Sequence, residues 1–130
     1  MIVLVDHNME GHAKLLWRTL ASAGWLELAP VQLVTFAEAG VPADSVDRAV
    51  WRFAQERQMF LLTDNRNMEG DDSLERTIRE ELTPESLPVL TVSNRDRLNE
   101  QKYRARCAER LLEVVLYPER YLGTGRIFIP

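Results

Sequence analysis

The chain has 130 residues, of which 45% are hydrophobic and 28% are charged, and it carries a net charge of −4. This composition is typical of one globular domain with its own core. The acidic balance argues against a protein that coats nucleic acid non-specifically, because such binding depends on many basic residues. No apolar run approaches the roughly 20 residues that cross a bilayer. No secretory signal is visible, and the single cysteine cannot form an internal disulfide, so we expect a cytoplasmic protein without a membrane partner.

Short apolar strands alternate with helices in the first half of the chain. A strand at residues 1–5 and a helix at about 12–23 come first, with Gly24 as the expected C-cap. A second strand at about 31–36 follows. Asp44 is then a strong N-cap candidate for a helix that ends near residue 57.

The second half repeats the pattern. A strand at about 59–63 leads into a polar loop at 64–72 and a short helix at 73–82, and the chain then has a strand at 88–92, a long helix at about 96–116 and a last strand at 126–129. The spacing of Cys107 with Leu111 indicates that the thiol faces the core. This order predicts an α/β fold, a three-layer α/β/α sandwich around a mostly parallel five-stranded sheet in a single domain at 1–130. Periodicity leaves the order of the strands open.

Acidic residues follow the apolar strands. Asp6, Asp64 and Asp96 come at or just after the ends of three predicted strands. Because the carboxyl ends of parallel strands share one edge of a sheet, we expect these acids to gather there. Such a cluster usually needs a cation, and Mg²⁺ or Mn²⁺ suits carboxylate ligands best. A cap or turn is the alternative role for Asp6, and the helix dipole alone would favour Asp47 in the first turn of its helix.

The loop at 64–72 is unusually polar. Asp72 or Ser73 can cap the helix that follows, whereas Asp64, Asn65 and Asn67 have no such role. The loop lacks the ligand spacing of a calcium-binding EF-hand. His7 and His12, five residues apart with no cysteine nearby, do not form a zinc pattern.

Basic residues concentrate between Arg95 and Arg110, in an otherwise acidic chain. A solvated helix face is one interpretation of this stretch. The other is a track for phosphate groups beside the acidic edge, with Tyr103 available to stack on a base.

Three segments carry a family resemblance: Asp6-His7-Asn8, then Asp47-Arg48-Ala49-Val50 with Ala54, then Thr63-Asp64-Asn65-Arg66-Asn67. They resemble the motifs of PIN-like domains, especially the small bacterial group related to the toxin ribonucleases of toxin–antitoxin pairs. The family pattern is a strand that ends in Asp-Glu-Asn, a helix that opens with Asp-x-x-Ile/Val and has Ala seven residues after the Asp, and a strand that ends in Thr-x-Asp. The likeness covers roughly residues 1–96, and its motifs are short.

The resemblance implies a ribonuclease that cleaves single-stranded RNA with Mg²⁺ or Mn²⁺ as cofactor. Asp6 and Asp47 match family acids directly, and Asp64 is the third expected catalytic acid, one residue early. The implied metal ligands are Asp6, Asp47, Asp64, Asn65 and Asp72, with Asp96 as an alternative to Asp72, and the implied substrate-binding residues are Asn8, Arg66, Asn67 and Arg95. Asn65 and Asn67 stand where the family often has acids, which implies a weakened nuclease.

Two alternatives belong to other classes of protein. A phosphoacceptor receiver domain would need adjacent acids after the first strand and a lysine after the last, and the chain has neither at those positions. A non-catalytic PIN-like module that pairs with a regulatory protein, such as a cognate antitoxin, or with RNA is favoured by Asn65 and Asn67. A homodimer also stays open as an assembly.

Overall fold

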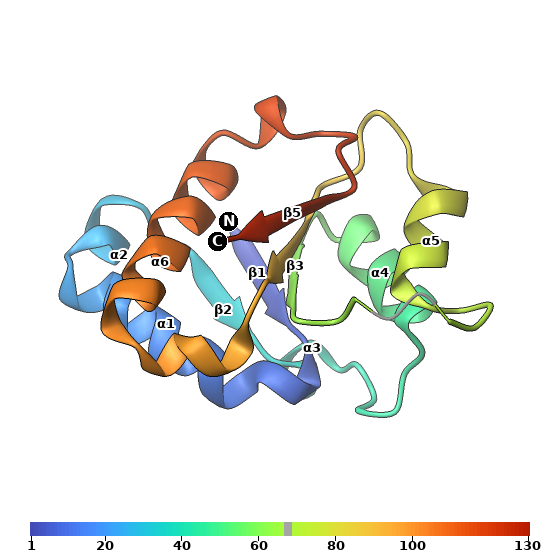
Figure 1. Cartoon of the computed structure of the whole chain (residues 1–130). Helices are drawn as coiled ribbons and strands as arrows, with labels where there is room; N and C mark the ends of the chain where they lie inside the picture. Colours follow the sequence, from blue (N-terminus) through green and yellow to red (C-terminus); the bar gives the residue numbers. More distant parts are fainter. Residues whose placement is uncertain (67–68) are drawn as a thin grey trace.

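The fold is built on five short parallel strands. In the computed structural model, which describes residues 1–66 and 69–130, the strands are β1 (Ile2–Val5), β2 (Gln32–Val34), β3 (Phe60–Thr63), β4 (Val89–Val92) and β5 (Arg126–Ile129). They form one sheet in the order β2-β1-β3-β4-β5, and every neighbouring pair is parallel (Figure 1). The predicted α/β class is therefore confirmed.

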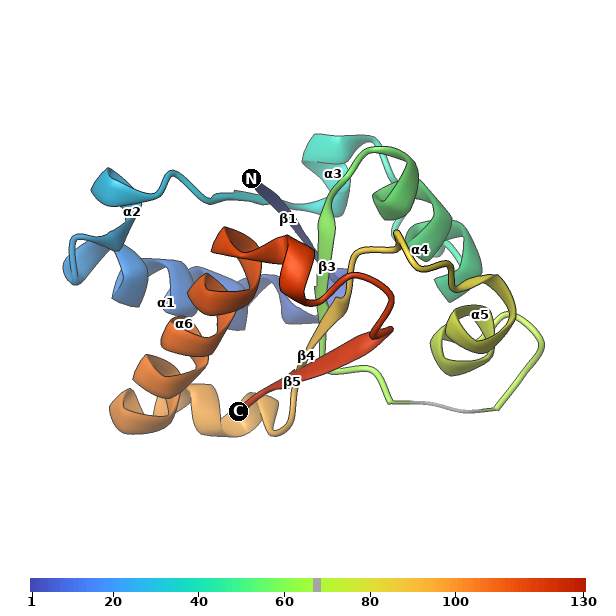
Figure 2. The same ribbon diagram turned by 90° about the horizontal axis from the view of Figure 1, so that it is seen from above.

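Helices cover both faces of this sheet. The α-helices are α1 (Glu10–Ser22), α2 (Trp25–Leu28), α3 (Phe36–Ala39), α4 (Asp47–Glu56), α5 (Leu74–Glu81) and α6 (Gln101–Leu116), and the 3₁₀ turns are η1 (His7–Met9), η2 (Arg95–Asn99) and η3 (Pro118–Arg120). Seen from above, α1 and α6 lie on one side of the sheet, and α4 and α5 lie on the other (Figure 2). None of the helices within the described residues is long and apolar enough to cross a membrane.

Alternation along the strands divides the core into two layers. Val3 and Val5 of β1 pack with α1 and α6, whereas Leu4 packs on the opposite face with α4 and α5. Cys107 is fully buried in the first layer, as its helical spacing predicts. Burial raises the pKa of its thiol to about 12, so it is a core residue and not a reactive nucleophile.

Three element boundaries differ from the sequence prediction, and capping hydrogen bonds decide two of them. Strand β2 ends at Val34, since Thr35 forms a capping box with Glu38 and Phe36 begins α3. Asp44 does not cap α4, which begins at Asp47 after Val46 without a side-chain cap. The long helix begins at Gln101 instead of near Asp96, because Asn94 caps the separate 3₁₀ turn η2.

Candidate active site

The order of the strands fixes where a site can form. The chain passes from β1 to β2 on one side and then crosses back to β3 on the other side of β1. In open parallel sheets, the crevice outside the carboxyl ends of the strands at such a reversal is the usual ligand site. In this protein the reversal lies between β1 and β3, the strands that end next to Asp6 and Asp64.

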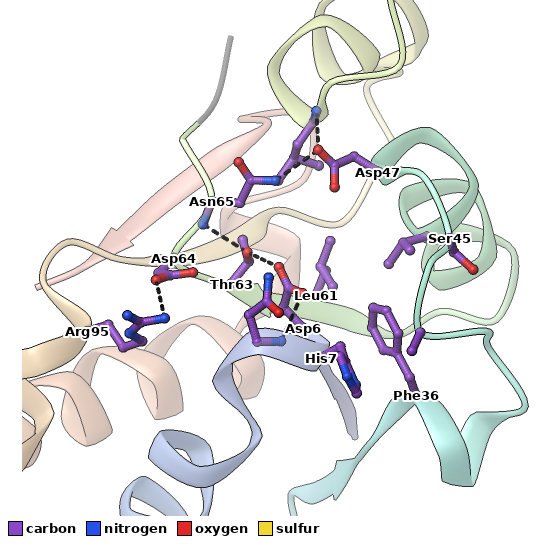
Figure 3. Close-up of a pocket in the computed structure, with 14 residues that line it drawn as sticks. Asp6, His7, Phe36, Ser45, Asp47, Leu61, Thr63, Asp64, Asn65 and Arg95 are labelled. Atoms are coloured by element: carbon purple, nitrogen blue, oxygen red, sulfur yellow. Dashed lines mark hydrogen bonds and ion pairs between the residues drawn. The ribbon is translucent and has the colours of Figure 1, made fainter. Parts of the chain in front are cut away.

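A cavity of about 580 Å³ lies at this position (Figure 3). We call it the acidic cavity, because three carboxylates line it among the described residues, those of Asp6, Asp47 and Asp64. Its other lining residues are His7, Asn8, Phe36, Ala43, Ser45, Val50, Leu61, Thr63, Asn65, Leu74 and Arg95. The structure therefore brings together the three acids that the sequence prediction named as catalytic.

Asp6 is held in place by the ends of both central strands. Its backbone N–H donates to the carbonyl oxygen of Leu62 at 2.8 Å, which continues the β1–β3 pairing. Its Oδ2 accepts a hydrogen bond from the buried Thr63 hydroxyl at 2.7 Å, and that hydroxyl in turn accepts from the Asn65 N–H at 3.0 Å. Burial raises the pKa of Asp6, although the hydrogen bonds from Thr63 and Asn8 oppose the shift; the negative charges of Asp47 and Asp64 raise it further.

Asp47 joins three parts of the chain from the first turn of α4. Its Oδ2 accepts from the side-chain amide of Asn65 at 2.9 Å and from the backbone N–H of Leu74 at 3.1 Å. Leu74 is the first residue of α5, so the carboxylate also faces the positive end of that helix. Asp47 is thus both a wall of the acidic cavity and a tie between α4, α5 and the end of β3.

Asp64 and Arg95 form an ion pair in the wall of the acidic cavity. Arg95 Nη1 lies 3.5 Å from Asp64 Oδ2, and its Nε lies 3.8 Å from Asp96 Oδ1. The Nε is buried and has no hydrogen-bond partner within the described part of the chain. Arg95 itself lines the cavity, and an anion there is the kind of group that a guanidinium recognises.

Only some of the other residues that the sequence prediction named lie at the acidic cavity. Asn8 and Asn65 line the cavity, whereas Arg66 is exposed and does not. The carboxylate of Asp96 is 84% exposed and lies outside the lining, so the expected gathering of acids at this edge does not include it. Asn67 lies outside the described residues.

Asp72 also lies apart from the acidic cavity. Its Oδ1 accepts from Arg48 Nε at 3.0 Å, and the same guanidinium pairs with Glu80 and Glu81 of α5. Asp72 therefore helps to dock α5 against α4. Tyr103 is likewise buried and cannot stack on a base, because its hydroxyl accepts the Asn94 N–H and its ring lies against the core.

Arg126 is a supporting residue that the sequence prediction missed. Its side chain, only 10% exposed, extends from β5 to donate to the Asn65 carbonyl oxygen at 2.8 Å and to the Thr91 hydroxyl at 2.7 Å. It also forms an ion pair of 3.1 Å with Glu75 of α5. An arginine among the apolar residues of the last strand was the available signal, but only the fold shows that it fixes the segment after β3.

The donor atoms of the acidic cavity suit a small divalent cation in kind. Within the described residues, no three acidic, histidine or cysteine side chains form a ready-made metal-binding group. Mg²⁺, however, is commonly held by one or two carboxylates and completes its shell with water. Asp6 and Asp64, whose charges act on each other across the cavity, are the residues that fit this mode.

Comparison with known proteins adds no assignment. No protein-family model, curated protein or solved structure matches this chain.

We expect Asp6→Asn to raise the melting temperature at pH 7, because it removes a charge that burial disfavours. The folded protein holds the pKa of Asp6 above its unfolded value of about 3.9, so the ionised carboxylate opposes folding at neutral pH. That opposition decreases as the pH falls through the raised pKa and is gone below about pH 4. Thermal unfolding of both proteins between pH 3.5 and 8 measures the difference. Glu119→Gln, which neutralises an exposed acid on η3, is the control and should show no such gain. Equal shifts for the two variants would contradict the burial argument.

Arg126→Met should lower the free energy of unfolding by roughly 1.5–3 kcal/mol, the range for hydrogen bonds to charged groups. The variant keeps the apolar stem but leaves Glu75 and the Asn65 carbonyl oxygen without the guanidinium. Urea unfolding followed by circular dichroism measures the loss. Arg79→Met, at an exposed position on α5, should stay within about 0.5 kcal/mol of the wild type. An Arg126→Met variant as stable as this control would show that the network contributes nothing.

Proposed function

We propose that this protein is a metal-dependent ribonuclease of PIN-like type that cleaves single-stranded RNA, with Asp6, Asp47 and Asp64 as its acidic residues. The observation that carries the proposal is the convergence of these three carboxylates on one cavity at the reversal between β1 and β3. Two of the three occupy positions that match motifs of the family, and they come from separate elements of the chain. A purely structural role would not need a partly desolvated acid beside two other negative charges.

The residues of the acidic cavity divide the work of such a reaction. Asp6 and Asp64 would hold Mg²⁺ or Mn²⁺, whose chemistry at such a site is Lewis-acid stabilisation of charge on the phosphate and a lowered pKa of water. Thr63 fixes the orientation of the Asp6 carboxylate through its hydroxyl. Arg95 lines the cavity, and its guanidinium would orient the scissile phosphate.

A non-catalytic module that binds RNA or a regulatory protein is the second candidate. The observation that favours it is the hydrogen bond from the Asn65 amide to Asp47 Oδ2. Asn65 holds this carboxylate in place without adding the negative charge that an acid would bring to a metal site. A module of this kind would keep the cavity and its shape but bind divalent ions weakly.

Millimolar Mn²⁺ should raise the melting temperature of the wild type, because a cation that binds only the folded protein stabilises it by mass action. The rise should be smaller in Asp6→Asn and unchanged in Glu119→Gln. Differential scanning fluorimetry across a Mn²⁺ titration is the measurement. A melting temperature that does not change with Mn²⁺ concentration would contradict the metal site and therefore the proposed enzymatic activity.

Cleavage of short single-stranded RNAs in Mn²⁺ is the direct test of activity. We expect slow cleavage that EDTA abolishes and that Asp6→Asn lowers by about 100-fold or more, since each charged group around a reacting phosphate is worth several kcal/mol. Glu119→Gln, purified identically, should cleave like the wild type. If wild type and Asp6→Asn leave the same trace of product, a contaminating nuclease explains it and the binding module is the better description.

A further inference from the structure

The two ends of the acidic cavity differ in chemistry. Asp64 and Arg95 pair at one end, and the rings of His7 and Phe36 lie together at the other, with Asp6 between them (Figure 3). Metal-assisted hydrolysis does not require the rings of His7 and Phe36, because neither ring is needed to bind a cation or a phosphate. The aromatic end therefore needs its own explanation.

His7 is placed at this end by its position in the chain. It opens η1 directly after Asp6, and its side chain lines the acidic cavity next to Phe36. Its Nδ1 lies 3.3 Å from Glu10 Oε1, a contact that uses the edge of the ring and not its face. The side chain is 48% exposed, unlike the other aromatic residue of the pair.

Phe36 supports the imidazole from behind. Only 4% of Phe36 is exposed, and it packs with Leu4, Val50 and Leu61 in the layer between the sheet and α4. The two ring centroids are 6.1 Å apart with the planes tilted by 33°. The buried ring of Phe36 thus forms the edge of the core, and the partly exposed ring of His7 lies against it in the wall of the cavity.

We infer that His7, supported by Phe36, is a nucleobase subsite, on which one base of a single-stranded RNA stacks while its phosphate lies near Asp6 and Arg95. Every nucleobase has a flat face, and stacking on an aromatic side chain is the usual way in which proteins hold unpaired bases. The cavity, at about 580 Å³, has the size of sites that enclose one small ligand, and a single nucleotide unit falls in that class. The inference rests on the proposed function for the placement of the phosphate, but stacking on His7 does not require that the chain cleave RNA.

Equilibrium binding in EDTA separates the base from the phosphate. The probes are a fluorescein-labelled hexaadenylate and an abasic hexamer of the same length and charge, measured by fluorescence anisotropy. The wild type should prefer hexaadenylate. His7→Ala should reduce this preference by roughly 5-fold to 100-fold, the effect of losing one base–aromatic stack, with little change in affinity for the abasic hexamer.

Two matched variants test the role of the ring. His7→Phe keeps a flat aromatic side chain and should retain the preference for hexaadenylate. Glu10→Gln keeps the imidazole and removes only the charge beside it, so it should also retain the preference. Far-ultraviolet circular dichroism of all variants confirms that they are folded.

Each outcome decides the question. A wild type that binds both hexamers equally, or a His7→Ala variant that loses affinity for both by the same factor, overturns the subsite. A preference that depends on His7 supports it even where the RNA is not cleaved, in which case the proposed ribonuclease fails and the subsite stands. Cleavage that depends on Asp6, together with a binding preference that is indifferent to His7, overturns the subsite and supports the ribonuclease.

Discussion

The parallel pairing of β1 with β3 is the constraint on which the rest of the structure depends. The register that sets Val5 beside Leu62 brings the two strand ends together, and the Asp6 N–H extends the ladder by one more hydrogen bond. Because β2 lies on the far side of β1, the connections leave these ends toward opposite faces, and the described segments leave the space beyond them open. That space is the acidic cavity, and Thr63 binds its central carboxylate across the pairing.

The core stabilises the folded state, whereas the charged groups of the acidic cavity destabilise it. Two apolar layers, one on each face of the sheet, provide the driving force for folding, whereas the charges at the strand ends oppose it. The structure secures the site from outside the cavity. Arg126 holds the Asn65 segment and Glu75, and Arg48 ties α4 to acidic groups of the loop and of α5. Groups that cost stability but are held firmly in place are typical of functional sites.

Asn65 is the residue on which the choice between the two proposed functions depends. Its amide orders Asp47, and its backbone is held by both Thr63 and Arg126. The position is therefore held through both its backbone and its side chain, yet it brings no charge. A nuclease with this arrangement would bind its cation through fewer carboxylates than the resemblance implies. The aromatic end at His7 is compatible with either function, because a base can be held with or without cleavage of its phosphate.

The sequence by itself determined the α/β class and the approximate extent of all five strands, and it placed Asp6 and Asp64 at strand ends, because buried strands are short apolar runs and polar residues follow them. Asp47 was named from the motif resemblance. Helix starts were less certain, since they depend on local capping hydrogen bonds such as those of Thr35 and Asn94. Strand order, and with it which acids meet, was decided only by tertiary structure. Asp72 and Asp96 were alternative metal ligands in the sequence prediction, but one pairs with Arg48 and the other faces solvent. Local pattern reflects neighbours in sequence, whereas the contacts of Arg126 with Asn65 join residues 61 positions apart, and only packing can bring those together.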